Sequence, residues 1–420
     1  MKFVKESKID APADAVFQWH ERPGAIHRLT PPWESVEVER EAPNLKDGEA
    51  VLKIKLAPGI KKRWVARHHD YVANEQFCDE QVDGPFSKWN HRHQFERVSD
   101  EQSVLRDEIV WELPMDSISA PLAGWQVKDK LRRTFAYRHR ITRQDLAMHR
   151  RAELDSLKVA ITGSSGLVGS SLAPFLTTGG HTVKRLVRSH KQADDDSILW
   201  KPKEGFPEGL ERLEGVDAVV HLAGENIASG RWTDERKRRI RDSRLDGTRS
   251  LCEGLARLKN KPKVLVSSSA IGIYGETGSD WVDETSPAGS GFLEDLATEW
   301  EEATAPAREA GIRVVFIRTG IVLSPAGGAL KKMLPAFSAG IGGRLGSGRQ
   351  YMSWISIDDM VGAIHHVIAN DQIEGPVNLV APHPVTNAEF TKPLTKVLNR
   401  PTGPPVPAFA LRILFGELAD

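Results

Sequence analysis

Three glycines, Gly163, Gly166 and Gly169, separate a short apolar run, Lys158–Thr162, from an apolar stretch with helical spacing. A strand that passes through such a turn into a helix uses each glycine differently. The first allows a tight turn, the second lets the backbone approach a pyrophosphate, and the third lets helix and strand pack closely. The helix N-terminus also offers free N–H groups and a partial positive charge to an anion. The segment therefore predicts a dinucleotide-binding turn; the alternative is a glycine-rich turn without a ligand.

Strands alternate with helical stretches from residue 157 onward. Apolar runs indicate strands at 158–162, 181–187, 218–222, 264–268 and 313–317, and the first helical stretch covers 167–177. Parallel strands need long crossovers, which are usually helices that cover both faces of the sheet. We therefore expect an α/β fold over residues 157–420, with a Rossmann-type doubly wound parallel sheet.

Residues 1–150 have a different sequence pattern, which is rich in strands. Strand-like alternation or enrichment in β-branched and aromatic residues predicts strands at 51–59, 62–72, 87–98 and 103–113, and helices are expected at 11–19 and 122–143. A polar, basic segment, 143–156, separates this strand-rich part from the part in which strands and helices alternate, and 420 residues suffice for two domains. We place the first domain at 1–150, as an α+β domain with an antiparallel sheet, and the second at 157–420.

Charge and cysteine content exclude several classes of protein. Lys+Arg and Asp+Glu both number 57, so no net charge attracts nucleic acid or an acidic membrane surface. No apolar run approaches the roughly 18 residues needed to span a bilayer, and the N-terminus lacks the apolar core of a secretory signal. The two cysteines, Cys78 and Cys252, exclude a disulfide framework and a cysteine-rich zinc site. We expect a cytoplasmic protein with a small-molecule substrate and no nucleic-acid or membrane partner.

The residue at the end of the second strand of such a fold indicates which dinucleotide binds. An acid there binds the ribose hydroxyl of NAD, whereas an arginine accommodates the 2′-phosphate of NADP. Arg188 lies 25 residues after Gly163, and the nearest acids, Asp194–Asp196, come later in an expected loop. The sequence therefore favours NADP(H) over NAD(H). The alternative is that Arg188 is only a solvated charge.

Several motifs of the second domain resemble those of one known family. The segments ITGSSGLVG, VDAVVHLAGENI and VLVSSSAIGIYG resemble the extended short-chain dehydrogenases, the NAD(P)-dependent epimerase/dehydratase-like family. The segments RDSRLDGT, RTGIVLSPAGGAL and GRLGSGRQYMSWISIDDM resemble a subgroup described as sugar-nucleotide epimerases or as cell-division-inhibitor-like proteins. The layout of residues 1–150 resembles a START-like helix-grip domain (SRPBCC, cyclase/dehydrase type). The resemblance implies an epimerase or oxidoreductase coupled to a ligand-binding domain.

The family resemblance also implies roles for individual residues. Arg188 would meet the 2′-phosphate, and Arg244 could reach the cofactor or be only a charge on a helix surface. The remaining cofactor-binding residues are implied at the glycine turn and at the ends of later strands: Gly163, Ser165, Gly166, Leu167, Val168, Gly169, Leu222, Ala223, Gly224, Ser267, Ile321 and Val322. Ser269, the last serine of its run, is the implied catalytic serine.

The expected catalytic pair is missing from this sequence. Short-chain dehydrogenases normally use Tyr-x-x-x-Lys, in which the lysine and the nicotinamide lower the tyrosine pKa for proton exchange. None of the four tyrosines is followed four residues later by lysine. Tyr274 is a candidate replacement, with a structural role as its alternative. The function is therefore either that of an NADP(H)-dependent oxidoreductase or epimerase on a small hydroxy or keto compound, including a sugar nucleotide, or that of a non-catalytic NADP(H) sensor.

The first domain offers weaker signals. His91 and His93 share a strand face and could both ligate a metal, but no accompanying carboxylate or cysteine pattern supports this, so the sequence predicts no metal site. Its many tryptophans could line an apolar cavity or fill a solid core. A hydrophobic ligand is the partner that the helix-grip resemblance implies for this domain.

Overall fold

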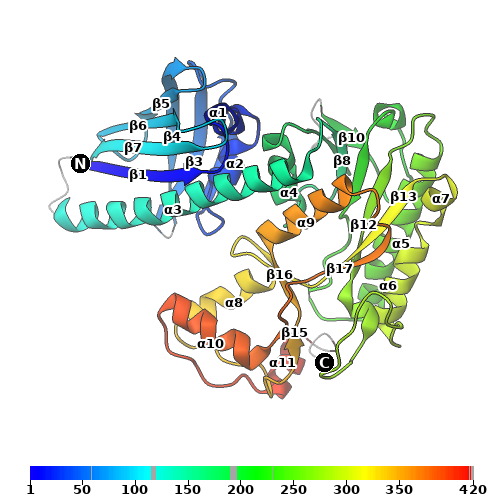
Figure 1. The fold of residues 1–420 in the computed structure, drawn as a ribbon. Coiled ribbons are helices and arrows are strands. Elements are labelled where there is room, and N and C mark those ends of the chain that lie inside the picture. The colour runs from blue at the N-terminus through cyan, green and yellow to red at the C-terminus, as the bar shows by residue number, and fades with distance from the viewer. Residues whose placement is uncertain (58, 115–119, 190–195, 229, 416, 418–420) are drawn as a thin grey trace. The chain divides into compact units, whose positions relative to one another are not determined.

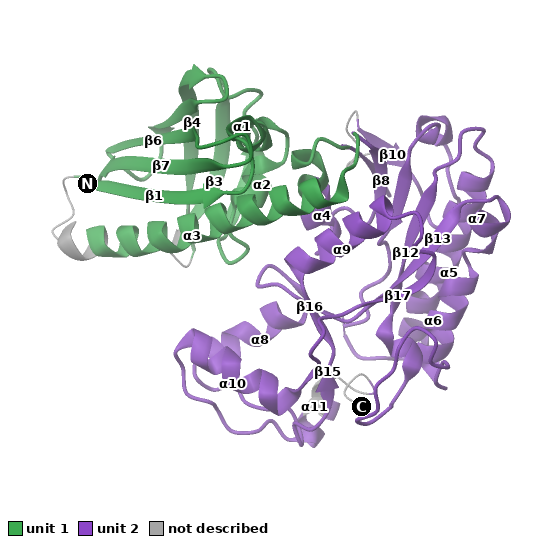
Figure 2. Ribbon diagram, in the orientation of Figure 1, with its two compact units in different colours: residues 1–155, 174–181 green, residues 156–173, 182–420 purple. Residues whose placement is uncertain are grey.

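The computed structural model describes residues 1–57, 59–114, 120–189, 196–228, 230–415 and 417. The chain forms two compact units (Figures 1 and 2). The first contains residues 1–155 and 174–181, and the second contains residues 156–173 and 182–420. Among the described residues, no helix combines the length and the apolar character required to cross a membrane.

The first unit is built on an antiparallel sheet of seven strands in the order β1-β7-β6-β5-β4-β3-β2. The strands are β1 (Lys2–Ile9), β2 (Val36–Arg40), β3 (Glu49–Ala57), β4 (Ile60–Val72), β5 (Gln76–Asp83), β6 (Lys88–Arg97) and β7 (Ser103–Glu112), and the helices are α1 (Ala13–Glu21), α2 (Ala25–Leu29) and α3 (Ala120–Ala152). The four predicted strands correspond to β3, β4, β6 and β7. The predicted α+β domain with an antiparallel sheet is confirmed.

Helix α3 is longer than the sequence indicates. The prediction ended this helix at residue 143, but the helix continues to Ala152. Two side chains explain the continuation: Asp145 is fully buried and accepts a bidentate pair of hydrogen bonds from Arg28, at 2.6 and 2.8 Å, and Leu146 packs into the core. The polar segment that seemed to separate two domains therefore has a buried face, and Figure 1 shows α3 running along the sheet.

Aromatic side chains fill the core of the first unit. Phe17, Trp19, Phe77 and Phe95 belong to one cluster of buried side chains, and Trp111 belongs to a second. Trp19 and Trp111 are almost completely buried, so these two tryptophans contribute to a packed core.

The second unit contains a parallel sheet of seven strands in the order β10-β9-β8-β11-β12-β13-β17. The strands are β8 (Lys158–Thr162), β9 (Thr182–Val187), β10 (Ser197–Leu199), β11 (Ala218–His221), β12 (Val264–Ala270), β13 (Arg313–Thr319) and β17 (Gly375–Leu379). The five predicted strands are present, every pairing is parallel, and the Rossmann-type fold is confirmed. The order reverses between β8 and β11, which is where open α/β sheets bind ligands.

Helices and short strands complete the second unit. Helix α4 (Gly169–Thr178) begins in this unit, and its residues from Pro174 onward belong to the first. The other helices are η2 (Leu210–Leu213), α5 (Asp234–Ala256), η3 (Ile271–Tyr274), α6 (Phe292–Glu302), α7 (Ala305–Glu309), α8 (Gly328–Ser338), α9 (Ile357–Ala369), α10 (Asn387–Leu398) and α11 (Ala408–Phe415). The strands β14 (Ile321–Leu323) and β16 (Trp354–Ser356) form one pair, and β15 (Tyr351–Met352) and β18 (Val385–Thr386) form another.

Candidate functional site

The glycine turn joins β8 to α4 at the carboxyl edge of the parallel sheet. Gly163 has φ +68°, and a Cβ there would lie 2.8 Å from the carbonyl group of Leu222. A Cβ at Gly169 would lie 2.4 Å from the carbonyl oxygen of Gly163. Both positions therefore exclude any side chain. Ser165 and Gly166 are exposed on the turn, Leu167 and Val168 are half-buried, and Gly169 is buried. The backbone N–H of Gly166 donates to the carbonyl oxygen of Gly163, at 2.9 Å, and closes the turn.

A buried hydroxyl connects the glycine turn to the neighbouring strand. Thr162 Oγ1 accepts hydrogen bonds from the backbone N–H groups of Leu222 and Ala223, at 3.1 and 3.2 Å. The same oxygen lies 2.7 Å from Nδ1 of His221, the residue directly opposite on β11. Thr162 thus fixes the segment that follows β11 against the start of the turn.

His221 extends this connection through the core. Its Nε2 lies 3.0 Å from Thr248 Oγ1 on α5, and that oxygen also accepts from Trp300 Nε1 on α6, at 2.8 Å. His221 is fully buried, and burial lowers its pKa to about 4. The ring is therefore neutral near pH 7, with one nitrogen accepting and the other donating between two hydroxyls.

Arg188 follows the last residue of β9 and is exposed. Among the described residues, its guanidinium has no hydrogen bond or ion pair. An exposed cation of this kind is available to an anionic ligand. Of the later acids, Asp194 and Asp195 lie outside the described residues.

Arg244 is not a free charge on a helix surface. From α5, its Nη1 donates to the carbonyl oxygens of Glu225 and Ile240, at 3.0 and 3.1 Å. Its guanidinium lies 4.9 Å from the ring centre of Trp300, and burial lowers its pKa to about 10. A Cβ on Gly224 would lie 3.4 Å from the guanidinium carbon, so Arg244 packs against the segment that follows β11.

The serine run ends β12 with two very different hydroxyls. Ser267 is fully buried, and its Oγ has no hydrogen-bond partner within the part of the chain that the structure describes. Ser269 donates to Glu301 Oε1, at 2.6 Å. Glu301 also accepts from Arg318, which lies opposite Ser269 on β13, through two bonds of 2.9 Å. The hydroxyl of Ser269 is therefore held by an ion pair between α6 and β13.

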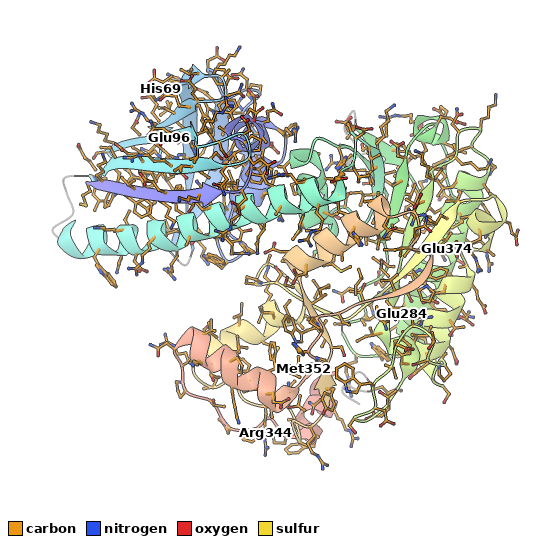
Figure 3. All side chains as sticks on the ribbon, in the orientation of Figure 1. His69, Glu96, Glu284, Arg344, Met352 and Glu374 are labelled. Atoms are coloured by element: carbon orange, nitrogen blue, oxygen red, sulfur yellow. The ribbon has the colours of Figure 1, made fainter. Side chains whose placement is uncertain are left out.

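Tyr274 belongs to the same hydrogen-bond network. Its hydroxyl accepts from Arg318 Nη1, at 3.0 Å, and donates to Asn378 Oδ1, at 2.7 Å. Asn378 in turn donates its backbone N–H to Glu284, which Figure 3 labels. Hydrogen bonds to Glu301 raise the pKa of Arg318, with a smaller contribution from Tyr274. Both the donor and an acceptor site of the phenol are used within the protein.

Ile321 and Val322 lie half-buried on β14. The backbone N–H of Ile321 donates to Ser353, at 2.8 Å, which fixes this strand beside β16. The glycine turn after β8 also contacts the segment that follows β14, because a Cβ at Gly327 would lie 3.0 Å from Leu167 Cδ1. Residues from the first βα turn and from the later glycine-rich stretch are therefore adjacent.

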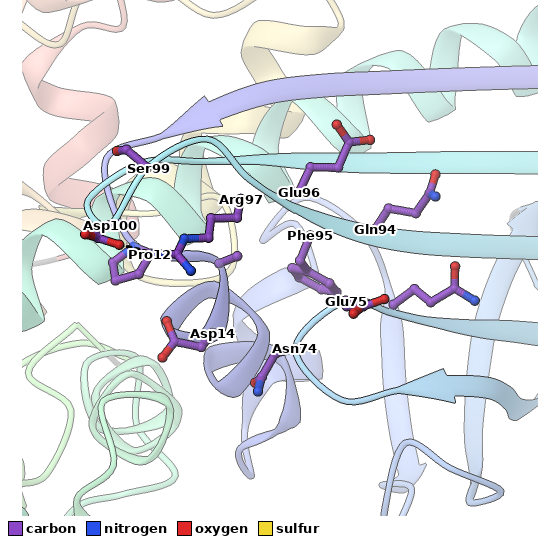
Figure 4. Close-up of a pocket in the computed structure, with 12 residues that line it drawn as sticks. Pro12, Asp14, Asn74, Glu75, Gln94, Phe95, Glu96, Arg97, Ser99 and Asp100 are labelled. Carbon is purple, nitrogen blue, oxygen red and sulfur yellow. Dashed lines mark hydrogen bonds and ion pairs between the residues drawn. The ribbon is translucent and has the colours of Figure 1, made fainter.

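The first unit has a hollow of about 860 Å³ at the start of α1 and at the turns that flank β5 and β6 (Figure 4). Phe95 lies in this hollow, but most of the other side chains that line it are polar or charged, including Asp14, Glu75 and Arg97. This lining does not favour an apolar ligand at this place.

Comparison with known proteins settles the family. Residues 159–380, more than half of the chain, match the NAD dependent epimerase/dehydratase family. The chain belongs to this family. An epimerase family protein of Mycobacterium bovis is 50% identical over 262 residues, which cover 62% of this chain and 86% of the relative. Residues 9–140 match the family described as polyketide cyclase / dehydrase and lipid transport, so the START-like resemblance is also confirmed.

Two solved structures are similar to this member of the epimerase/dehydratase family. The nucleoside-diphosphate sugar epimerase from Corynebacterium glutamicum is 33% identical, with a TM-score of 0.80, and the match covers 99% of this chain and 88% of that chain. The human epimerase family protein SDR39U1 (isoform 2), solved with NADPH, is 32% identical, with a TM-score of 0.57, and covers 62% of this chain and 86% of that chain.

Helix α6 carries no tyrosine and no lysine, so this epimerase/dehydratase family member does not place a Tyr-x-x-x-Lys pair there. The sequence predicts Ser269 and Tyr274 as catalytic residues but does not indicate Glu301 and Arg318, the groups that hold them. Glu301 lies on an acidic helix without a motif. Arg318 is the first residue of the segment RTGIVLSPAGGAL, but the sequence assigned it no role. Its position after the apolar run VVFI was a further signal in the sequence.

Proposed function

We propose that the chain is an NADP(H)-dependent oxidoreductase or epimerase that acts on a small hydroxy or keto compound, with nucleoside-diphosphate sugars as one candidate class. The choice of NADP(H) rests on Arg188 at the end of β9, which is exposed and has no partner among the described residues. The human relative was solved with NADPH, which supports the same choice.

The residues present fit a dinucleotide. The glycine turn, from Gly163 to Gly169, would hold the pyrophosphate, because no side chain can occupy either end of this turn. Leu222, Ala223 and Gly224 would line the ribose side, positioned by Thr162 and Arg244. Ile321 and Val322 would meet the nicotinamide end. Ser267 would contribute through its backbone, because its hydroxyl is buried.

The catalytic roles are proposed for Ser269 and Tyr274. The bound cofactor would supply or accept the hydride. Ser269 would polarise the substrate oxygen, and Tyr274 would exchange a proton with it, in place of the missing pair. Arg318 Nη1 donates a hydrogen bond to the Tyr274 hydroxyl, at 3.0 Å, and would hold the phenol in place for this exchange.

Titration calorimetry with NADPH and NADH tests the cofactor. Arg188→Ala should weaken NADPH binding by roughly 10- to 100-fold, the value of one charge-assisted contact, and leave NADH binding unchanged. Arg249→Ala, which removes an exposed arginine on α5, is the matched control. Equal losses for the two cofactors, or no loss, would contradict the assignment.

A non-catalytic NADP(H) sensor is the second candidate. This function is favoured because the hydroxyl groups of Ser269 and Tyr274 already donate hydrogen bonds within the protein, to Glu301 and Asn378. Screening carbonyl compounds for loss of NADPH absorbance separates the two functions. Turnover that Ser269→Ala abolishes without loss of NADPH binding supports the enzyme; tight NADPH binding with no turnover supports the sensor.

We place the ligand-binding function of the first unit within residues 1–150 and the cofactor-binding domain within residues 157–420. The match of residues 9–140 supports a hydrophobic ligand for the first domain. Mass spectrometry of the lipids or aromatic compounds that co-purify with the protein would identify this ligand.

A further inference from the structure

A cluster of carboxylates and imidazoles lies inside the antiparallel sheet of the first unit. Asp79 on β5 lies directly opposite His91 on β6, and His93 on β6 lies opposite Asp107 on β7. His91, His93 and Asp107 are 2%, 6% and 3% exposed, so the cluster is almost sealed from water. Asp79 is its least buried member, with 15% of its side chain exposed. Ionised groups are rarely buried so deeply without a specific partner.

Three donor atoms converge on one side of this cluster. Asp79 Oδ2 lies 3.0 Å from His91 Nδ1 and 3.2 Å from His93 Nε2. These carboxylate and imidazole atoms all lie within 4.8 Å of one another. Zn²⁺ binds such atoms at about 2.0–2.2 Å, which in tetrahedral geometry separates neighbouring donors by roughly 3.3 Å. The observed separations therefore need only small shifts to surround a metal ion.

Asp107 lies on the other side of the same two rings. Its Oδ1 is 2.8 Å from His91 Nε2 and 2.8 Å from His93 Nδ1, although the second contact lacks hydrogen-bond geometry. Its Oδ2 is 2.6 Å from His139 Nε2, on α3. Histidines that ligate metals commonly donate their other N–H to a carboxylate, which orients the ring. Asp107 has this position toward His91, and it lies beside His93 Nδ1 at a distance from which a small rotation of the ring would complete the same bond.

Two carboxylates, Asp79 and Asp107, lie in this almost sealed cluster. A divalent metal ion would supply two positive charges at one point beside them.

We propose that Asp79, His91 and His93 bind a divalent transition-metal ion, and that Asp107 orients the two histidines. Two imidazoles and one carboxylate suit Zn²⁺ or Fe²⁺ and not Mg²⁺ or Ca²⁺, which prefer oxygen ligands. Three protein ligands leave at least one position for water or a small molecule, as in metal sites that act on a ligand. The least buried ligand, Asp79, marks the side from which the ion enters.

Metal binding by the full chain tests this proposal. After removal of metals with a chelator, we expect one Zn²⁺ per chain with a dissociation constant tighter than about 1 μM, measured by competition with a chromophoric chelator. Co²⁺ as a probe should give the visible absorption of a nitrogen- and oxygen-ligated ion. Elemental analysis of untreated protein then distinguishes zinc from iron.

Variants locate the ion. Asp79→Asn and His93→Gln should each weaken Zn²⁺ binding by at least about 100-fold, and Asp107→Asn by roughly 10- to 100-fold with the Co²⁺ spectrum retained. His27→Gln, at a largely exposed histidine on α2, is the matched control and should bind normally. Circular dichroism checks that each variant folds.

Two results would overturn the proposal. One is wild-type protein that takes up no Zn²⁺ and shows no Co²⁺ absorption, which decides the matter even when a variant fails to fold. The other is folded Asp79→Asn and His93→Gln protein that binds Zn²⁺ as tightly as the His27→Gln control. Either result would make the cluster a purely structural ion-pair network.

Discussion

Protonation of His221 should limit the acid stability of the second unit. The ring lies between Thr162 and Thr248, and burial lowers its pKa from 6.5 to about 4. In the unfolded chain the ring binds a proton as the pH falls through 6.5, whereas the folded protein stays neutral down to about pH 4. The unfolded state thus binds more protons in this window, so stability falls as the pH falls. One pKa unit is worth about 1.4 kcal/mol, which gives roughly 3 kcal/mol in total and about 2 kcal/mol at pH 5.

His221→Gln isolates this contribution. Glutamine keeps one donor and one acceptor for the two threonines but does not titrate. The variant should be less stable than wild type at pH 7, and the difference in unfolding free energy should shrink by about 2 kcal/mol at pH 5. Hydrogen exchange of peptides from β8 and β11, followed by mass spectrometry, reports the stability of this region. His366→Gln, at an exposed histidine on α9, is the control. A wild-type-to-variant difference that is the same at pH 7 and pH 5 would refute the reasoning.

Three further substitutions test the second unit. Gly169→Ala places a Cβ 2.4 Å from the carbonyl oxygen of Gly163, so calorimetry should show NADPH binding at least about 10-fold weaker, with the circular dichroism spectrum unchanged. Tyr274→Phe leaves Asn378 without its donor, and chemical denaturation should show a loss of about 1–3 kcal/mol. Thr386→Ala removes the capping box of α10 and should cost about 1 kcal/mol in the same assay.

The strands and the glycine turn could be predicted because local chemistry determines them. Short apolar runs bounded by turn residues are typical of buried strands, and a glycine at φ +68° can be replaced by few residues. Strand β5 could not be predicted in this way. Its sequence QFCDEQVD is mostly polar, and Asp79 faces the interior because imidazoles on β6 receive it. The missing strand also explains why no carboxylate seemed to accompany His91 and His93.

The supporting groups of the candidate site were beyond sequence reasoning for a different reason. Thr162, His221 and Thr248 come from three separate elements. Each lies within a segment that carries the family resemblance, but the sequence implied no role for any of them. Their connection depends on the register of β8 beside β11, which only the assembled sheet fixes. A motif therefore contains both residues that would touch a ligand and residues that hold the backbone in place. The sequence alone does not separate the two kinds, because the second kind is recognised only by its partner on another element.

The hydroxyl of Ser269 decides between the two proposed functions. A serine that polarises a substrate carbonyl must donate its hydrogen to that oxygen, yet here the hydrogen is donated to Glu301, at 2.6 Å. Breaking a hydrogen bond to a charged group costs about 1.5–3 kcal/mol, a cost that substrate binding can offset. Glu301 would keep two bonds from Arg318 after that change and would not be left unpaired. The network therefore permits Ser269 to turn toward a substrate, and catalysis requires that it does so; a sensor would leave the bond intact in every ligand state.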